Sequence, residues 1–249
     1  MIRVIGCVRD HHDPLLVMVA AAICFLSSLA SIKVWWLGSD AAAGSRRRWM
    51  ALAGCASGFG VWATHFVGML AYLPDVPVSY DLSLVLTSLV IAIALISAGL
   101  SVAETQGLSG SWLAGGVIVG LAISAMHYLG AQSILLPGRI GWEPDLVVSS
   151  LVISIGAASA ALRAASGKRS RGKLVLAAAL LSFAVTGLHF TAMTALIILP
   201  DPTRSVAGGL SGQQIALLIS CVAAVLLIIG SGSVVLDRRP RLPRRLARD

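Results

Sequence analysis

Charged residues are scarce in this sequence. Of its 249 residues only 12% are Asp, Glu, Lys or Arg, whereas 57% are hydrophobic, and the mean hydropathy is +0.88. A soluble domain carries about 25% charged residues. The scarcity excludes a packed aqueous core as the source of the apolar composition and indicates a membrane protein. At about 20 apolar residues per crossing, the length allows roughly seven or eight crossings and leaves no room for a soluble catalytic domain.

The cysteines and the acidic residues exclude two further classes. The four cysteines (Cys7, Cys24, Cys55 and Cys221) show no CxxC spacing, and three of them fall within apolar runs. The sequence therefore predicts neither a zinc site nor a disulfide framework. No acidic residue lines an apolar run, which argues against a proton-coupled transporter.

Seven long apolar runs, separated by Pro, Gly, Asp and Arg clusters, divide the chain. They cover residues 15–37, 49–73, 82–102, 112–136, 146–162, 174–199 and 215–236. Each is long enough, or nearly so, to cross about 30 Å of hydrocarbon as a helix, and the fifth is the shortest. The first is too long for a signal peptide, and Asp13 and Pro14 fit the N-cap and first position of a retained helix. The predicted fold class is all-α: a polytopic membrane protein with seven transmembrane helices.

The basic residues predict the orientation of these helices. Fifteen of the 19 Lys and Arg residues lie on one side of the membrane, and seven of the 11 acidic residues lie on the other. Because cytoplasmic connections are enriched in Lys and Arg, we expect the N-terminus outside and the C-terminus inside a cell inner (plasma) membrane. The predicted organisation is an extracytoplasmic segment 1–14, a membrane domain 15–236 and a short basic cytoplasmic tail 237–249.

A pI near 10 does not indicate a nucleic-acid partner here. The basic residues serve as membrane anchors and as contacts for the anionic headgroups of the lipid bilayer.

Three histidines reveal an internal repeat. His65, His127 and His189 are equally spaced, an aromatic residue follows each, and a small residue stands three positions after each. Because a period of about 62 residues accommodates two crossings with their loops, we predict three two-helix repeats of this length plus one helix. The histidines then fall on the second, fourth and sixth helices. Small residues seven before and three after each histidine predict close helix packing around a common axis.

The histidines are candidate metal ligands. An ionisable side chain inside a membrane faces the bundle interior and marks function by default. Since residues four apart share a helix face, His65 lies with Met69 and His189 with Met193. Imidazole combined with thioether suits copper, above all Cu(I), and haem is a second option. Cys55, about 15 Å along the helix from the first histidine, is not expected to share the site.

Two alternatives remain open from the residues alone. The repeat is also explained by duplication of a packing motif, with histidine hydrogen-bonded to Ser124 or Thr186. Outside the first helix, His11 and His12 stand beside Asp13. They are interpreted as an entry site or a cap over the cluster, with the carboxylate orienting an imidazole, or as a solvated pair at a helix start.

At these motifs the chain resembles the MHYT domain, a bacterial integral-membrane sensor domain, in a stand-alone form. The resemblance covers nearly the whole chain. It implies copper near the outer face, sensing of oxygen, CO or NO, and ligand roles for six residues: His65, Met69, His127, His189, Met193 and His12. Only Met126-His127-Tyr128 keeps the Met-His-Tyr order, and Ala131 stands where a methionine is expected.

The predicted function is therefore that of a membrane sensor or signalling protein with a copper site in the outer half of the bundle and no catalytic turnover. Its expected stimulus is a diatomic gas ligand or a redox change, and its output passes to a separate signalling partner. Two other interpretations are a membrane protein that handles copper or a haem or redox group, and a structural module whose histidines only pack.

Overall fold

The computed structural model describes residues 2–74, 76–105, 110–201, 203 and 208–237. Over these residues the chain forms eight helices: α1 (Ile2–His11), α2 (Pro14–Ser39), α3 (Ala43–Ala71), α4 (Leu82–Ala103), α5 (Ser111–Gln132), α6 (Pro144–Ala165), α7 (Arg171–Ala195) and α8 (Gly212–Asp237). Six of them, α2 to α7, are long and apolar enough to cross a membrane. The prediction of an all-helical membrane fold is confirmed. The seventh crossing stays a prediction, because the apolar stretch of α8 among the described side chains covers only Gly212–Val225.

Local sequence signals set the helix starts. The Asp13 carboxylate accepts a hydrogen bond from Leu16 N at 2.9 Å, and Pro14 occupies the first helical position of α2, as predicted. Asp81 caps α4 in the same way. The run expected to be shortest, 146–162, belongs to a helix of 22 residues that begins at Pro144, so its length suffices for a crossing.

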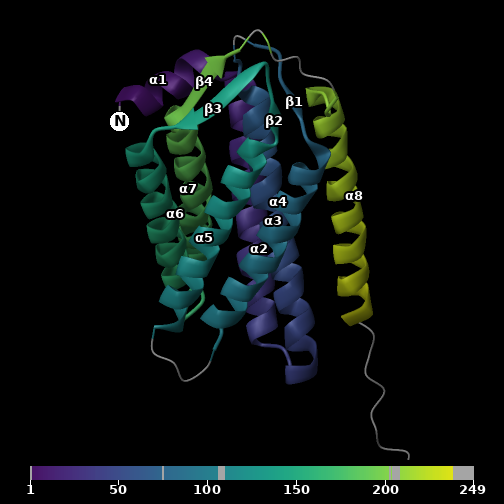
Figure 1. The fold of residues 1–249 in the computed structure, drawn as a ribbon. Helices are drawn as coiled ribbons and strands as arrows, with labels where there is room; N and C mark the ends of the chain where they lie inside the picture. Colours follow the sequence, from purple (N-terminus) through teal and green to yellow (C-terminus); the bar gives the residue numbers. More distant parts are fainter. Residues whose placement is uncertain (1, 75, 106–109, 202, 204–207, 238–249) are drawn as a thin grey trace, which may run out of the picture.

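The six long helices form a ring with approximate threefold symmetry. The histidine-bearing helices α3, α5 and α7 touch one another at the axis, and α2, α4 and α6 lie outside them. Each hairpin packs on the next, and α7 contacts α2, which completes the ring. Helix α8 stands beside the ring and contacts α3 (Figure 1).

Glycines allow the close helix contacts of this ring. A Cβ atom on Gly58 would lie 2.7 Å from the Cα of Ile93 in α4, and one on Gly120 would lie 2.5 Å from the Cα of Ile155 in α6. The predicted small residues seven positions before the histidines therefore face the outer helices. They do not face the common axis that the sequence suggested.

Four short strands cover one end of the bundle, here called the strand end. Strand β1 (Ser79–Tyr80) pairs antiparallel with β2 (Ile134–Leu135), and β3 (Gly138–Trp142) pairs with β4 (Leu196–Pro200). Helix α1 lies across this end, near β4 (Figure 1). The sequence predicted neither the strands nor α1, because segments 134–136 and 196–199 continue apolar runs whose length favours helix.

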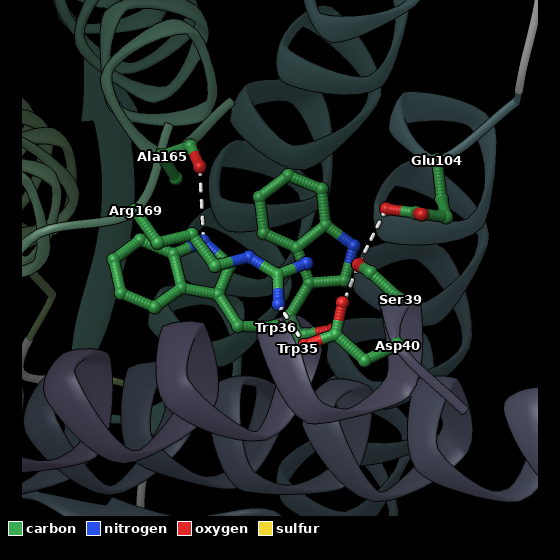
Figure 2. A network of polar contacts seen from close by, with 7 residues as sticks. All are labelled: Trp35, Trp36, Ser39, Asp40, Glu104, Ala165 and Arg169. Carbon is green, nitrogen blue, oxygen red and sulfur yellow. Dashed lines mark hydrogen bonds and ion pairs between the residues drawn. The ribbon is translucent and has the colours of Figure 1, made fainter. Parts of the chain in front are cut away.

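The opposite end, here called the basic end, is joined by polar contacts around the last turn of α2 (Figure 2). Trp36 Nε1 donates a hydrogen bond to the carbonyl of Ala165 at 2.9 Å. Arg169 pairs with Asp40, and its guanidinium lies 5.7 Å from the centre of the Trp36 ring. Ser39 Oγ donates to the carboxylate that follows α4 at 2.7 Å. These contacts bind α2 to the ends of α4 and α6 and to the α6–α7 loop.

The helix directions separate the charges as the sequence predicted. The basic residues of the α2–α3 and α6–α7 connections lie at the basic end, and the acidic residues that precede α2, α4 and α6 lie at the strand end. The predicted tail lies outside the described residues, apart from Asp237.

Candidate metal centre

The three repeated histidines meet on the axis of the ring. His65 lies in the last two turns of α3, and His127 and His189 lie at the matching depth of α5 and α7, near the strand end. Their side chains are buried, with exposed fractions of 1%, 1% and 4%. The predicted convergence of the three imidazoles is confirmed. Among the described residues they form the one group of three or more His, Cys, Asp or Glu side chains close enough to hold a metal ion.

The Nδ1 atoms of the triad point at one another. The Nδ1 atom of His65 lies 3.1 Å from Nδ1 of His127 and 3.3 Å from Nδ1 of His189. The ring planes stand at 77° to 90° to one another, with centres 4.8 to 5.4 Å apart. The three imidazole rings are arranged like the blades of a propeller. Their Nδ1 atoms lie at its centre and are here called the hub.

Hydrogen bonds alone cannot satisfy this hub. A neutral imidazole nitrogen carries either one hydrogen or one lone pair. His65 Nδ1 takes part in both short contacts, so only one of them is a well-directed N–H···N hydrogen bond. A cation at the hub accepts a lone pair from all three nitrogens at once. The chemistry of the donor set therefore fits a metal ion better than a hydrogen-bonded cluster.

The outer edges of two of the three imidazoles, His65 and His189, lie against a neighbouring helix. A Cβ atom on Gly130 of α5 would lie 2.4 Å from Nε2 of His65, and one on Gly68 of α3 would lie 2.7 Å from Nε2 of His189. The small residues three positions after the histidines thus leave room for the imidazole of the preceding blade. Ala192 holds the equivalent position of the third repeat and is buried.

The residue after each histidine adds an aromatic wall. The ring centres of Phe66, Tyr128 and Phe190 lie 4.8, 5.1 and 5.2 Å from those of the preceding histidines. The Tyr128 hydroxyl bonds Ser150 Oγ of α6 at 2.7 Å, so it is directed away from the hub. The aromatic residue of the motif packs against the histidine in every repeat, and in the second repeat it also links the centre to an outer helix.

His12 lies beside the triad. Its ring centre is 6.3 Å from that of His189, and its side chain is 4% exposed. Burial lowers the pKa of His12, which favours the neutral ring. Nδ1 then donates its hydrogen to the Cys7 carbonyl at 3.0 Å, which leaves a lone pair on the buried Nε2.

Two expectations about this region are wrong. Asp13 does not orient the His12 imidazole, because its carboxylate caps α2 and the Cys7 carbonyl takes that role. The hydroxyls of Ser124 and Thr186 donate to carbonyls of their own helices, Gly120 O at 2.9 Å and Ser182 O at 3.0 Å. Among the described residues, the imidazoles of His65, His127 and His189 form hydrogen bonds only with one another.

The methionines are buried on the histidine helices. Met69 and Met193 are 2% and 3% exposed, one helical turn beyond His65 and His189. Their role as thioether ligands stays a prediction. Cys55 lies in the basic-end half of α3, away from the centre, as expected from its spacing.

Sequence reasoning missed the Cys7 carbonyl and the ring of Tyr72. The latter packs against His12 with centres 5.4 Å apart. Neither carries a motif, since both reach the centre through the docking of α1 and the β-bridge between His12 and Tyr72.

Comparisons with known proteins recover the same repeat. The family model described as MHYT, a bacterial signalling protein N terminal repeat, matches residues 58–116 and again 120–178. The two matches begin at equivalent positions, the glycines seven before His65 and His127, so they share the spacing of the histidines. The chain belongs to the MHYT family. No solved structure matches it.

Curated MHYT relatives are signalling proteins. An uncharacterized signaling protein of Caulobacter vibrioides is 32% identical over 94% of this chain and 29% of its own length. The bifunctional diguanylate cyclase/cyclic di-GMP phosphodiesterase MucR of Pseudomonas aeruginosa is 29% identical over 92% of this chain and 35% of its own. The cyclic di-GMP phosphodiesterase NbdA of the same organism is 36% identical over 61% and 20%. The MHYT chain thus spans about a third or less of the length of these relatives.

Proposed function

We propose that this MHYT protein is a membrane sensor in which Nδ1 of His65, His127 and His189 holds one copper ion. The observation that carries the proposal is the hub of three buried Nδ1 atoms, with contacts of 3.1 and 3.3 Å. Two nitrogens bound at about 2.0 Å to one tetrahedral ion lie about 3.3 Å apart. The two separations from His65 Nδ1, 3.1 and 3.3 Å, are close to that value, and the ligand atoms of all three histidines lie within 4.8 Å of one another.

The surroundings favour Cu(I) over the other candidates. The group offers three neutral imidazoles and no carboxylate, so a monovalent ion leaves less uncompensated charge inside the membrane than a divalent one. Thioethers from Met69 and Met193 would strengthen this preference for a soft ion. A haem ligated by two histidines lies between them with its whole macrocycle, and nitrogens about 3 Å apart leave no room for one.

His12 supplies a further ligand or an exchangeable one. Its free Nε2 lone pair and its position beside His189 support this role. The metal would provide an open coordination position for a diatomic gas, or a redox couple, and the chain's own part is to hold the ion and exclude water.

The membrane arrangement follows the charge distribution. We place the strand end outside and the basic end in the cytoplasm of a bacterial inner membrane, with α8 as the seventh crossing. The names of the relatives support signalling as the output, carried by a cytoplasmic or membrane partner, and a chain without catalytic turnover of its own.

The copper content of purified protein tests the proposal. Wild-type protein loaded under reducing conditions is expected to retain one copper per chain, and His127→Ala to lose most of it. Cys55→Ala is the matched control, because it alters another potential copper ligand on a histidine helix and is expected to retain the metal. Equal loss in both variants, or no copper in the wild type, contradicts the proposal. A Soret band in the optical spectrum would show that the site holds haem and not copper.

A further inference from the structure

An apolar groove opens between α1, α6 and α7. Its volume is about 790 Å³, and its walls include Val4 and Val8 of α1, Leu146 and Ile153 of α6, and Phe183 and Phe190 of α7. Phe183 is 56% exposed on the outer surface of α7. The groove lies on the flank of the bundle, in the half nearer the strand end, where a membrane-spanning bundle meets lipid tails. A concave apolar site of this size is typical of those that take small ligands.

One aromatic ring separates this groove from the metal centre. Phe190 lines the groove, and its ring centre lies 5.2 Å from that of His189 and 5.3 Å from that of His12. Thr191, also in the lining, is the second residue after His189 and is 7% exposed. The groove and the triad therefore share a wall one side chain thick.

The approach along the axis from the strand end is covered by hydrogen-bonded backbone. The β-bridges His12–Tyr72 and Tyr80–Leu210 join segments across that end, as do the paired strands β1–β2 and β3–β4. The main-chain N–H of Asp13 donates to the carbonyl of Ala71 at 2.8 Å. Breaking such buried backbone pairs costs more than the rotation of one phenylalanine ring.

We infer that the groove is the route by which a small, uncharged, apolar ligand passes from the bilayer to the histidine triad, with Phe190 as its gate. The inference rests on the proposed function, since the triad is its destination. Apolar molecules partition from water into hydrocarbon, so a lateral route draws on the phase in which such a ligand is concentrated. The lining is mostly apolar, with Arg9, Ser149, Thr186 and Thr191 as its polar members, so the path favours an apolar ligand over an ion.

Helix α1 connects the groove to His12. Val4 and Val8 lie in the lining, and the carbonyl of Cys7, between them in sequence, holds the His12 imidazole. A ligand in the groove therefore contacts the helix that positions the fourth histidine.

Xenon tests the groove without any metal. In metal-free protein, xenon under pressure is expected to shift the methyl resonances of Ile153 and Val8, as xenon does on entering an engineered apolar cavity. The methyls of Val152, a neighbour on α6 that is 65% exposed and lies outside the groove lining, are expected to respond only as other exposed methyls do. Equal shifts at Ile153 and Val152 overturn the inference.

Carbon monoxide tests the route. In protein loaded with Cu(I), Ile153→Trp and, independently from the α1 side, Val8→Trp are expected to slow CO association at least about tenfold, and Phe190→Ala to speed it. The copper content and the C–O stretching frequency of the two tryptophan variants are expected to stay the same. Val152→Trp is the matched control and is expected to leave the rate unchanged.

The outcomes separate the two proposals. Copper-loaded variants whose CO association rates equal that of the wild type refute the route and leave the metal site standing. Failure of the wild type to bind copper refutes the proposed function and removes the destination of the route, whatever xenon does in the groove. A variant that does not fold is replaced by the other of the two tryptophan variants, which fills the groove from a different helix.

Discussion

Nε2 of His65 points at the backbone of Gly130, so closely that a methyl group added there would lie 2.4 Å from it. This contact joins the first and second repeats across the axis, and the contact between His189 and Gly68 joins the third and first. The glycine does not supply chemistry to the centre. Its missing side chain sets where the imidazole lies, and hence where Nδ1 points.

We expect Gly130→Ala to displace the His65 imidazole. Overpacking of this kind costs about 1–3 kcal/mol of folding stability and outweighs the gain of up to about 1 kcal/mol in helix propensity. Copper affinity should fall with stability, because Nδ1 leaves the hub. Thermal unfolding in detergent and a Cu(I) titration measure both effects.

Gly156→Ala is the control for that change. It lies in α6, and an added Cβ meets no atom within 4 Å. It should leave copper binding intact and leave stability unchanged or raised by about 0.5–1 kcal/mol. Equal effects of the two alanines on copper affinity would contradict the role assigned to Gly130.

We expect Trp→Phe to change folding stability differently at the adjacent residues Trp35 and Trp36 of the basic end. Trp36 Nε1 donates to Ala165 O, whereas the buried Trp35 Nε1 has no hydrogen-bond partner among the described residues (Figure 2). Trp→Phe removes a similar volume at each site. Trp36→Phe should therefore be less stable than Trp35→Phe by about 1 kcal/mol, the net value of one hydrogen bond. The melting temperatures of the two variants test this difference, and equal melting temperatures would contradict a stabilising role for the Trp36–Ala165 hydrogen bond.

The docking of α1 is expected to weaken in acid. Arg3 makes two hydrogen bonds to the Glu143 carboxylate, at 2.8 and 2.9 Å, and this partner lowers the pKa of Glu143. A carboxyl whose pKa is lower in the folded state stabilises it above the unfolded pKa and loses that effect as pH falls through the folded value. The protection factors of the α1 amides, which compare the observed exchange rate with the intrinsic rate at the same pH, should fall below about pH 4.5, the ordinary pKa of Glu.

Because the pair is exposed, its contribution is small. Arg3→Gln should abolish this fall in protection while leaving α1 helical at pH 7. Retention of the full acid response in this variant would assign it to another group.

The repeat explains why the centre was predictable from sequence. Equal spacing puts three histidines at one depth on equivalent helices, and burial of polar groups in a membrane turns them toward the axis. The capping of α2 by Asp13 was predictable for a different reason, because an N-cap is a local sequence signal.

Features that depend on tertiary contacts were not predictable. The apolar runs continue to residues 136 and 199, whereas α5 ends at Gln132 and α7 at Ala195 and a strand follows each helix. Apolar composition is compatible with helix and with strand, so it did not reveal these helix ends. Helix α1 carries charge and is short, and its contacts lie with α7 and with Glu143. The position of His12 follows from that docking, so the residues alone left it open between a ligand and a solvated side chain.

X-ray absorption at the copper edge of the loaded protein tests the proposed histidine site most directly. We predict an imidazole multiple-scattering pattern from at least three nitrogens at about 2.0 Å, reduced in His127→Ala and unchanged in Cys55→Ala. Additional sulfur scattering would add Met69 or Met193 to the ligand set. A spectrum without imidazole scattering, or one that His127→Ala leaves unaltered, would contradict the histidine site.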